Sequence, residues 1–263
     1  MLKKEEKILI EGSIKIGIKL SRAQINKFSH YFDILNLWNK NTNLTSLKDH
    51  QDIIIKHFLD SLTCVKIIKN YIDYTTNKEK DITIIDIGTG AGFPGVPLKI
   101  IFPYLKLTLL DIQKKKAAFL KTLIEELRFS GVFIFTERAE KLGKMPEYRE
   151  NYNIAISRAV APLSILSEYS LPLVKQGGWF VAQKGRSYKK ELECSLKVVK
   201  FLGGELLKLE NVQLPFLNQE RYILIIKKTK NTPRKYPRRA GLPQKRPLNF
   251  YNIFDKIYIF LLA

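Results

Sequence analysis

The chain has 263 residues, 45% of them hydrophobic and 27% charged, which fits one folded α/β domain with an added segment. The charged start of the chain argues against a secretory signal, and no stretch reaches the roughly 18 apolar residues that a membrane span needs. The formal net charge of +20 favours a polyanionic partner, with nucleic acid ahead of an anionic membrane surface.

The two cysteines, Cys64 and Cys194, lie in apolar stretches of helical pattern. Neither has a second metal ligand beside it at the spacing that zinc sites use. Both are expected to be reduced thiols, which is typical of a cytoplasmic protein. We therefore predict no metal site and a cytoplasmic location.

The first part of the chain has the apolar spacing of helices, over residues 8–40 and again over 49–68. This pattern predicts an N-terminal helical extension that covers residues 1–70. The polar residues 69–81 are interpreted as a linker or loop to the next domain.

Three polar residues, His57, Asp60 and Ser61, share one face of the second predicted helix. They suggest a hydrolase triad at first sight. A triad needs its histidine between the nucleophile and the acid, which neighbours on one helix cannot provide. We interpret them instead as a polar face packed on the domain that follows.

From residue 82 onward, strand and helix patterns alternate, and the alternation ends with two successive strands. It predicts a Rossmann-like sheet over residues 71–228, mostly parallel with a terminal antiparallel strand. Strands are predicted at 82–87, 106–111, 132–136, 153–157, 178–183, 205–212 and 221–227, and helices at 95–102, 113–128, 162–174 and 188–202.

The first predicted strand ends at Asp86 and runs into a glycine-rich loop. Glycine allows backbone conformations and close approaches that other residues do not. Ligands in such sheets bind beyond the carboxyl ends of the strands, so we expect a nucleotide-like ligand over this loop. Four glycines fall within eight positions: Gly88, Gly90, Gly92 and Gly95.

The loop also satisfies the GxGxxG pattern of dinucleotide sites, which alone is weak evidence. Pro94 and Pro97 remove two amide donors where a pyrophosphate would bind, and Asp86 would place a negative charge close to it. A carboxylate there suits a cationic ligand without phosphate, such as S-adenosylmethionine. An NAD-dependent oxidoreductase is therefore the least favoured interpretation.

Polar residues also follow the next three strands. Asp111 can accept hydrogen bonds from ribose hydroxyls, in NAD as well as in S-adenosylmethionine. Ala139 and Glu140 lie where the adenine edge would be, and Arg158 lies at the rim that faces the methyl group. The chain has no Asn-Pro-Pro or Asp-Pro-Pro turn of amino-group methyltransferases, and no cysteine nucleophile at a strand end.

The end of the chain is strongly basic, with nine Lys or Arg and no acidic residue between Lys227 and Pro247. Prolines and a tyrosine are interleaved with these charges. We predict a basic arm and an apolar tail over residues 229–263, with the arm extended and bound to RNA. The alternative is a disordered, solubilising tail.

The chain resembles the bacterial ribosomal RNA small subunit methyltransferase G family, also called glucose-inhibited division protein B. The resemblance covers about residues 22 to 248. Its matching pieces are Trp38-Asn39-Lys40, Asn43 to Ser46, His57 to Ser61, Asp86 to Pro97, Leu110-Asp111, Lys115-Lys116, Phe119-Leu120, Ser157 to Ala159, Lys184-Gly185, Glu220-Arg221 and Thr232 to Gly241.

The resemblance implies methylation of N7 of one guanine in 16S ribosomal RNA, with S-adenosylmethionine as the methyl donor. By position it assigns Gly88 and Phe93 to the cofactor loop, Ala139 and Glu140 to the adenosine end, and Arg158 to the region between cofactor and target. Asp86, Gly90 and Asp111 complete the predicted cofactor site. Candidate RNA contacts are Lys184, Arg186, Arg234, Lys235, Arg238 and Arg239.

Guanine N7 is a lone pair without a proton, so in-line displacement needs no general base. Arg158 is the candidate for orienting the target, and its alternative role is a salt bridge to Asp86 or Glu140. We expect a monomer whose partner is 16S ribosomal RNA or the small ribosomal subunit. Two alternatives stay open: a methyltransferase acting on tRNA, protein or a small molecule, and a non-catalytic RNA-binding protein on the same fold.

Overall fold

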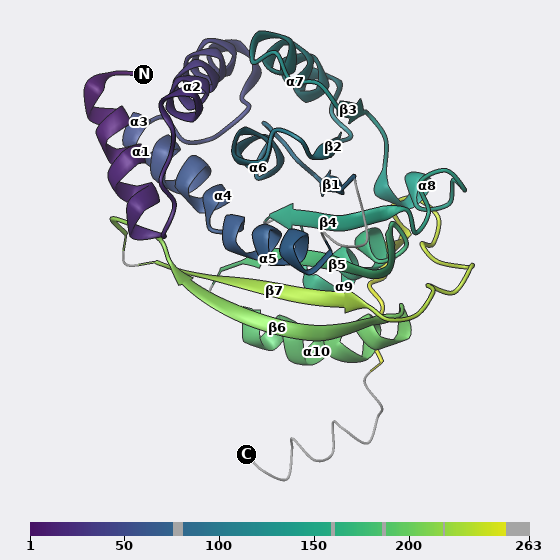
Figure 1. The fold of residues 1–263 in the computed structure, drawn as a ribbon. Coiled ribbons are helices and arrows are strands. Elements are labelled where there is room, and N and C mark those ends of the chain that lie inside the picture. Colours follow the sequence, from purple (N-terminus) through teal and green to yellow (C-terminus); the bar gives the residue numbers. More distant parts are fainter. Residues whose placement is uncertain (76–80, 159–160, 186–187, 218, 251–263) are drawn as a thin grey trace.

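The structure is a computed structural model that describes residues 1–75, 81–158, 161–185, 188–217 and 219–250. A central sheet lies between two layers of helices (Figure 1). None of the helices in these described ranges has the length and apolar composition needed to cross a membrane.

The sheet contains seven strands in the order β3-β2-β1-β4-β5-β7-β6. Strands β1 to β5 pair in parallel, and β7 pairs antiparallel with both β5 and β6. The predicted Rossmann-like sheet, mostly parallel with an antiparallel end, is confirmed. The strands are β1 (Thr83–Ile87), β2 (Lys106–Leu110), β3 (Val132–Phe135), β4 (Tyr152–Arg158), β5 (Val174–Lys184), β6 (Gly204–Gln213) and β7 (Glu220–Lys228).

The order of the strands places the ligand site. The chain builds β1, β2 and β3 toward one edge and then returns to place β4 on the other side of β1. Crossover connections therefore leave opposite faces at this point, which opens a crevice above the carboxyl ends of β1 and β4. The glycine-rich loop after β1 and Arg158 at the end of β4 both lie at this edge.

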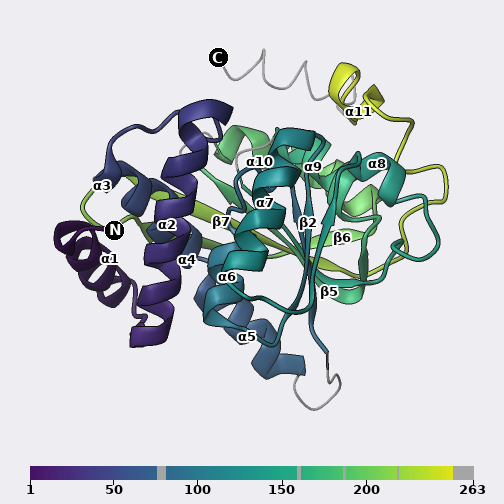
Figure 2. The ribbon, with the colours of Figure 1, turned by 90° about the horizontal axis from the view of Figure 1, so that it is seen from above.

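One face of the sheet is covered by α6 (Gly95–Ile101), α7 (Lys114–Glu126) and the N-terminal helices. The longest of these helices, α2 (Arg22–Thr42), packs along α6 and α7 (Figure 2). The other face is covered by α8 (Ala139–Leu142), α9 (Leu163–Ser170) and α10 (Tyr188–Phe201). All four helices predicted between residues 95 and 202 are present, with ends shifted by at most a few residues.

The N-terminal layer is more broken than predicted. Residues 8–40 form two helices, α1 (Lys3–Lys15) and α2, because Gly17 turns the chain with a φ of 78°. The second predicted helix is a series, α3 (His50–Ile53), the π-helix η1 (Ile54–Leu59) and α4 (Asp60–Leu62). The predicted linker is wrong for its first part, because α5 (Val65–Thr75) runs through it.

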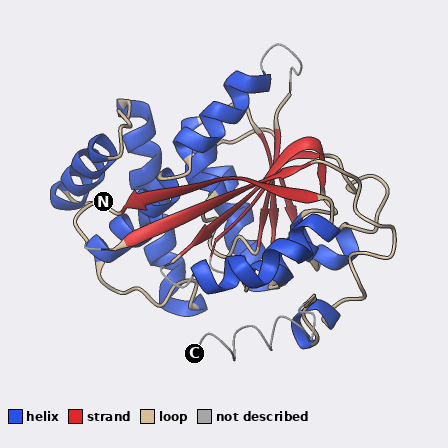
Figure 3. Ribbon diagram, turned by 90° about the horizontal axis from the view of Figure 1, so that it is seen from below, coloured by secondary structure: helices blue, strands red, loops and turns tan. Residues whose placement is uncertain are grey.

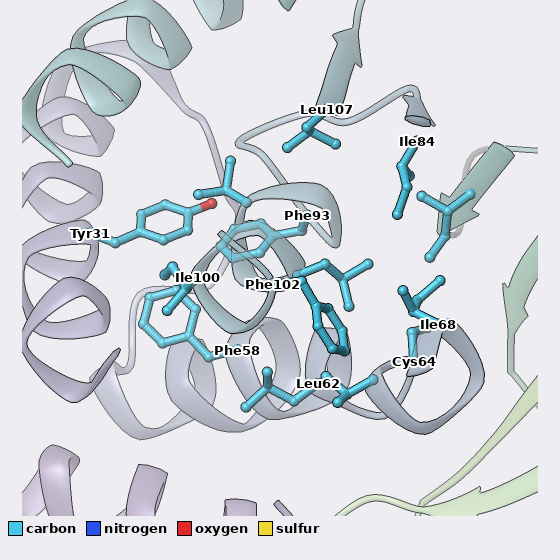
Figure 4. Close-up of a cluster of buried hydrophobic side chains, with 14 of the residues drawn as sticks. Tyr31, Phe58, Leu62, Cys64, Ile68, Ile84, Phe93, Ile100, Phe102 and Leu107 are labelled. Atoms are coloured by element: carbon cyan, nitrogen blue, oxygen red, sulfur yellow. The ribbon is translucent and has the colours of Figure 1, made fainter. Parts of the chain in front are cut away.

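This layer shares its hydrophobic core with the sheet instead of forming a separate unit. Figure 4 shows Phe93 of the glycine-rich loop among side chains of α2 and η1. The Phe93 ring stacks on Tyr31 with centroids 5.2 Å apart and lies 5.8 Å from Phe58. The β6–β7 hairpin also reaches α1 (Figure 3), where the Lys15 ammonium lies 4.3 Å from the Phe216 ring centroid.

The C-terminal segment, residues 229–250, differs from the predicted extended arm. It folds back on the α8–α9 face, contains the short helix α11 (Leu242–Lys245) and buries the Tyr236 ring against Phe201. Arg149 donates to the carbonyl oxygens of Thr232 and Tyr236, at 2.7 and 2.8 Å. The apolar tail predicted beyond this segment, residues 251–263, lies outside the described residues.

Candidate active site

The glycine-rich loop is held in shape by Asp86 at the end of β1. Its Oδ2 accepts hydrogen bonds from the Gly95 amide at 2.8 Å and the Thr89 hydroxyl at 2.7 Å. The side chain is fully buried, and burial raises the pKa of Asp86 to about 6. Asp86 therefore acts on the loop, not as the ligand-facing charge that the sequence suggested.

The same hydrogen bond bears on the choice of cofactor. Helix α6 begins at Gly95, and its first amide is already donated to Asp86. A dinucleotide pyrophosphate would need such amides at the N-terminus of this helix. The loop geometry thus agrees with a ligand that has no phosphate, although the reason differs from the electrostatic one predicted.

A cavity of about 390 Å³ opens above the carboxyl ends of β1, β2 and β4. Its floor is the turn at Gly88, whose φ of 71° is one that side chains rarely adopt. Several predicted cofactor residues line it together, and Gln244 of α11 joins them. Its walls include Gly88, Asp111, Ala139, Glu140, Arg158 and Gln244.

Asp111 is the strand-end carboxylate that does face the cavity. It accepts from the Gly90 amide and the Gln113 amide, each at 3.0 Å, and the Lys116 ammonium lies 3.6 Å from it. A carboxylate has about four lone-pair positions, so acceptor capacity is left for two vicinal hydroxyls. The Asp111 carboxylate can therefore accept further hydrogen bonds from a ligand in the cavity.

Ala139 and Glu140 form the first turn of α8 and close the far end of the cavity. The Glu140 side chain is 3% exposed, and its Oε1 accepts from the Gly241 amide at 2.7 Å. This bond ties the C-terminal segment to the cavity and brings Gln244 to its wall. Gln244 was not predicted from the sequence, because the Lys- and Arg-rich pattern around it does not indicate a residue that lines a cofactor cavity.

Phe93 lies behind the cavity and is not among the residues that line it. Its buried ring stacks on the His57 imidazole, with centroids 4.6 Å apart, and the Arg158 guanidinium carbon lies 5.1 Å from the ring centroid. Phe93 therefore supports the residues of the wall.

Arg158 reaches the cavity wall from the end of β4, with 13% of its side chain exposed. Its Nη1 donates to Asp60 Oδ2 at 3.1 Å and to the Lys56 carbonyl at 3.0 Å, and its Nη2 lies 3.3 Å from His57 Nδ1. The salt bridge weighed for Arg158 is thus made to Asp60, not to Asp86 or Glu140. The predicted polar face of His57 and Asp60 does pack on the following domain.

The candidate RNA contacts fall into two groups. Lys184 is 8% exposed and pairs with Glu191 at 2.7 Å, and Arg238 pairs with Glu168 at 2.7 Å. Both therefore differ from the exposed, unpaired cations that RNA contacts were expected to be. Arg186 lies outside the described residues. The exposed candidates are Arg234, Lys235 and Arg239.

The mostly parallel sheet closed by an antiparallel strand, with the cavity at its switch point, is the Rossmann-like sheet of methyltransferases.

A family model described as rRNA small subunit methyltransferase G matches residues 24–227. The ribosomal RNA small subunit methyltransferase G of Acetivibrio thermocellus is 46% identical over 245 residues, covering 93% of this chain and 97% of that protein. The protein of the same name from Alkaliphilus oremlandii is 46% identical, covering 92% and 98%. This chain belongs to the rRNA small subunit methyltransferase G family.

The chain is accordingly an S-adenosylmethionine-dependent methyltransferase, and its residues fit that cofactor. A Cβ added at Gly90 would meet no described atom within 4 Å, so the loop leaves room above it. Asp111 would hold the ribose, Gly88 would lie under the methionine part, and the first turn of α8 would border the adenine. The bound group would supply a sulfonium methyl as the electrophile.

Proposed function

We propose that this methyltransferase acts in the cytoplasm on N7 of a guanine in 16S ribosomal RNA. Family membership supports the RNA substrate, and the target side of the cavity supports the atom. Asp60 and His57 flank Arg158 there, and hydrogen bonds occupy Asp60 Oδ1 and Oδ2 and both His57 nitrogens. An acceptor that carries no proton suits such a site, because no base is needed to remove one.

In this proposal the residues of the chain act by placing two reactants in line. The loop after β1 and Asp111 fix the donor, and Arg158 fixes the target nucleotide through its planar set of N–H groups. Positioning of this kind supplies up to roughly 7–11 kcal/mol of the barrier reduction. No side chain is required to gain or lose a proton.

The proposal is tested with 16S ribosomal RNA and small subunits from cells that lack the gene, incubated with the purified protein and S-adenosylmethionine. Borohydride and aniline cleave RNA at N7-methylguanine, so one new cleavage site is expected. Methyl incorporation without any cleavage would place the methyl group on another atom and overturn the proposal.

Arg158→Lys tests the role of the guanidinium in the same assay. A lysine donates all its N–H groups from a single nitrogen. It lacks the planar spread of donors with which a guanidinium can reach Asp60, the Lys56 carbonyl and a substrate at the same time. We expect kcat to fall by about 10- to 100-fold, the equivalent of removing one charged hydrogen bond. Affinity for S-adenosylhomocysteine should stay at the wild-type value; full methyl transfer by this variant would remove Arg158 from the mechanism.

A further inference from the structure

We infer that Asp60, His57 and Thr45, all in the N-terminal helical layer, are positioning residues that hold the Arg158 guanidinium at the cavity wall. The inference rests on the proposed role of Arg158 toward the target nucleotide. It makes the N-terminal layer a working part of the methyl-transfer site, although only Arg158 of this group lines the cavity.

Asp60 is the centre of the arrangement and is 4% exposed. Its Oδ2 accepts from Arg158 at 3.1 Å, and its Oδ1 accepts from Arg221 Nε at 2.9 Å and Gln183 Nε2 at 3.1 Å. Donors from β4, β5 and β7 therefore converge on one carboxylate of α4. Such a carboxylate has little freedom to move, and neither has the guanidinium bound to it.

The π-helix η1 supplies the second acceptor. Its Lys56 carbonyl accepts from Arg158 Nη1 at 3.0 Å, so a backbone group of the N-terminal layer contacts the site residue directly. Short π-helical segments are rare and are frequent at functional sites. Here the segment presents the Lys56 carbonyl and the His57 ring to the guanidinium that Asp60, the first residue of α4, also binds.

His57 supplies the third acceptor, and its protonation is set by its neighbours. Burial, followed by the Arg158 charge, lowers the pKa of His57 to about 3, so the imidazole is neutral. Arginine can only donate, so Nδ1 is the acceptor and Nε2 carries the proton. That proton is donated to the Thr45 hydroxyl oxygen at 2.7 Å.

Arg158 selects the tautomer of His57, and the Nε2 proton that results is accepted by Thr45. The Thr45 Oγ1 also accepts from the Leu47 amide at 3.1 Å, which fixes the hydroxyl in place. A guanidinium has five N–H groups, and described residues engage three of those of Arg158. One N–H on Nε and one on Nη2 are left to meet an oxygen of the target nucleotide.

Thr45→Val and Thr45→Ser form a matched pair that tests the contact of Thr45 with His57. Valine keeps the shape and removes the acceptor, so the Nε2 proton of the half-buried ring loses its partner and the imidazole is no longer held toward Arg158. We expect kcat for RNA methylation to fall about tenfold in Thr45→Val and to be retained in Thr45→Ser. S-adenosylhomocysteine affinity should be equal in both, since the cofactor side is untouched; equal kcat in the two variants would overturn the role of Thr45.

Asp60→Asn and Arg221→Gln test the carboxylate. Both disturb the same buried cluster and should lower the melting temperature, but only Asp60→Asn loosens Arg158. We expect kcat to fall by about tenfold or more in Asp60→Asn alone. If kcat falls in both variants in proportion to the decrease of their melting temperature, Asp60 has only a structural role.

Arg158→Lys in the same assay distinguishes the proposed role of Arg158 from the positioning role of Thr45 and Asp60. If Arg158→Lys is impaired while Thr45→Val and Asp60→Asn are not, the positioning inference fails and the proposed function stands. If Arg158→Lys transfers methyl groups at the wild-type rate, the proposed role of Arg158 fails, and the positioning role fails with it.

Discussion

The N-terminal helical layer and the C-terminal segment both lie outside the alternating strands and helices. Each of them is connected to the cavity by its own arginine–carboxylate pair. The N-terminal layer contributes the carboxylate, Asp60, to an arginine of the sheet. The C-terminal segment contributes the arginine, Arg238, to Glu168 on α9. The first pair includes Arg158 of the cavity wall, and the second anchors the segment that bears Gln244.

The difference shows that a charge pattern alone does not reveal which charges are internal. Arg238 belongs to the most basic stretch of the chain, but its Nε and Nη2 bind a carboxylate that is 0% exposed. Asp60 belongs to an ordinary helical stretch and joins donors of three strands. The two regions should therefore respond to mutation in different ways, with methyl transfer affected at Asp60 and cofactor binding at Glu168.

Glu168→Gln should have the largest effect on cofactor binding. The variant leaves Arg238 beside a neutral amide, at a cost of about 2 kcal/mol in the free energy of unfolding. Residues 229–250 should then loosen, and with them the bond from Gly241 to Glu140. We expect S-adenosylhomocysteine to bind about tenfold more weakly by calorimetry, a change of about 1.4 kcal/mol.

Glu205→Gln is the matched control, since Glu205 is exposed on β6 and its replacement changes the net charge equally. It should leave both stability and affinity near the wild-type values. Reduced stability of Glu168→Gln with unchanged affinity would mean that the C-terminal segment is a clamp on α9 and takes no part in the cofactor site.

The pH dependence of stability should divide between the same two regions. The pKa of His57 is lowered to about 3, so below pH 6.5 the unfolded chain binds a proton that the folded chain does not. The pKa of Lys228, where the C-terminal segment leaves the sheet, is lowered to about 8 by burial. Each group contributes a rise of the free energy of unfolding with pH of up to about 1.4 kcal/mol per unit, His57 from pH 3 to 6.5 and Lys228 from pH 8 to 10.5. Asp86, whose pKa is raised to about 6, contributes a fall of similar slope between about pH 4 and 6. The contribution of His57 is therefore the difference between the wild type and a His57 variant.

His57→Gln and Lys228→Met serve as controls for each other. His57→Gln should lower the slope below pH 6.5 relative to the wild type and leave the alkaline slope unchanged, and Lys228→Met should do the reverse. Denaturant titrations at a series of pH values measure both slopes. An acid slope that is the same in His57→Gln as in the wild type would contradict the neutral imidazole on which the selection of its tautomer depends.

Much of the fold followed from the sequence because its signals are local. Alternating patterns predicted the strands, and the carboxyl ends of parallel strands meet at one edge, so Asp111, Ala139, Glu140 and Arg158 were expected to gather there. The structure brings all four to one cavity. The direction of Asp86 was not predictable, because the loop that follows folds back and takes its carboxylate.

The contacts between distant parts of the chain could not be predicted in the same way. Arg158 and Asp60 are 98 positions apart, and Arg238 and Glu168 are 70 apart. Periodicity says which face a side chain is on but not which partner it meets. The break at Gly17 carried a usable signal, because a glycine inside a helical pattern often marks an end.

The smallest expected effect distinguishes the exposed cations of the C-terminal segment from Arg238. Arg234 and Lys235 are exposed and are the better candidates for binding phosphate groups of the RNA. Replacing both by Gln should reduce the slope of log K against log salt for RNA binding by roughly 0.7–0.9 for each phosphate that is no longer neutralised. Arg238→Gln should leave that slope unchanged and weaken cofactor binding, as is expected of Glu168→Gln.

Truncation after Lys228 would not separate these effects, because it also removes Thr232, whose amide donates to Glu150 at 2.7 Å. A salt slope that also falls in Arg238→Gln, by as much as it does for each residue replaced in the double variant, would show that Arg238 leaves Glu168 when RNA binds.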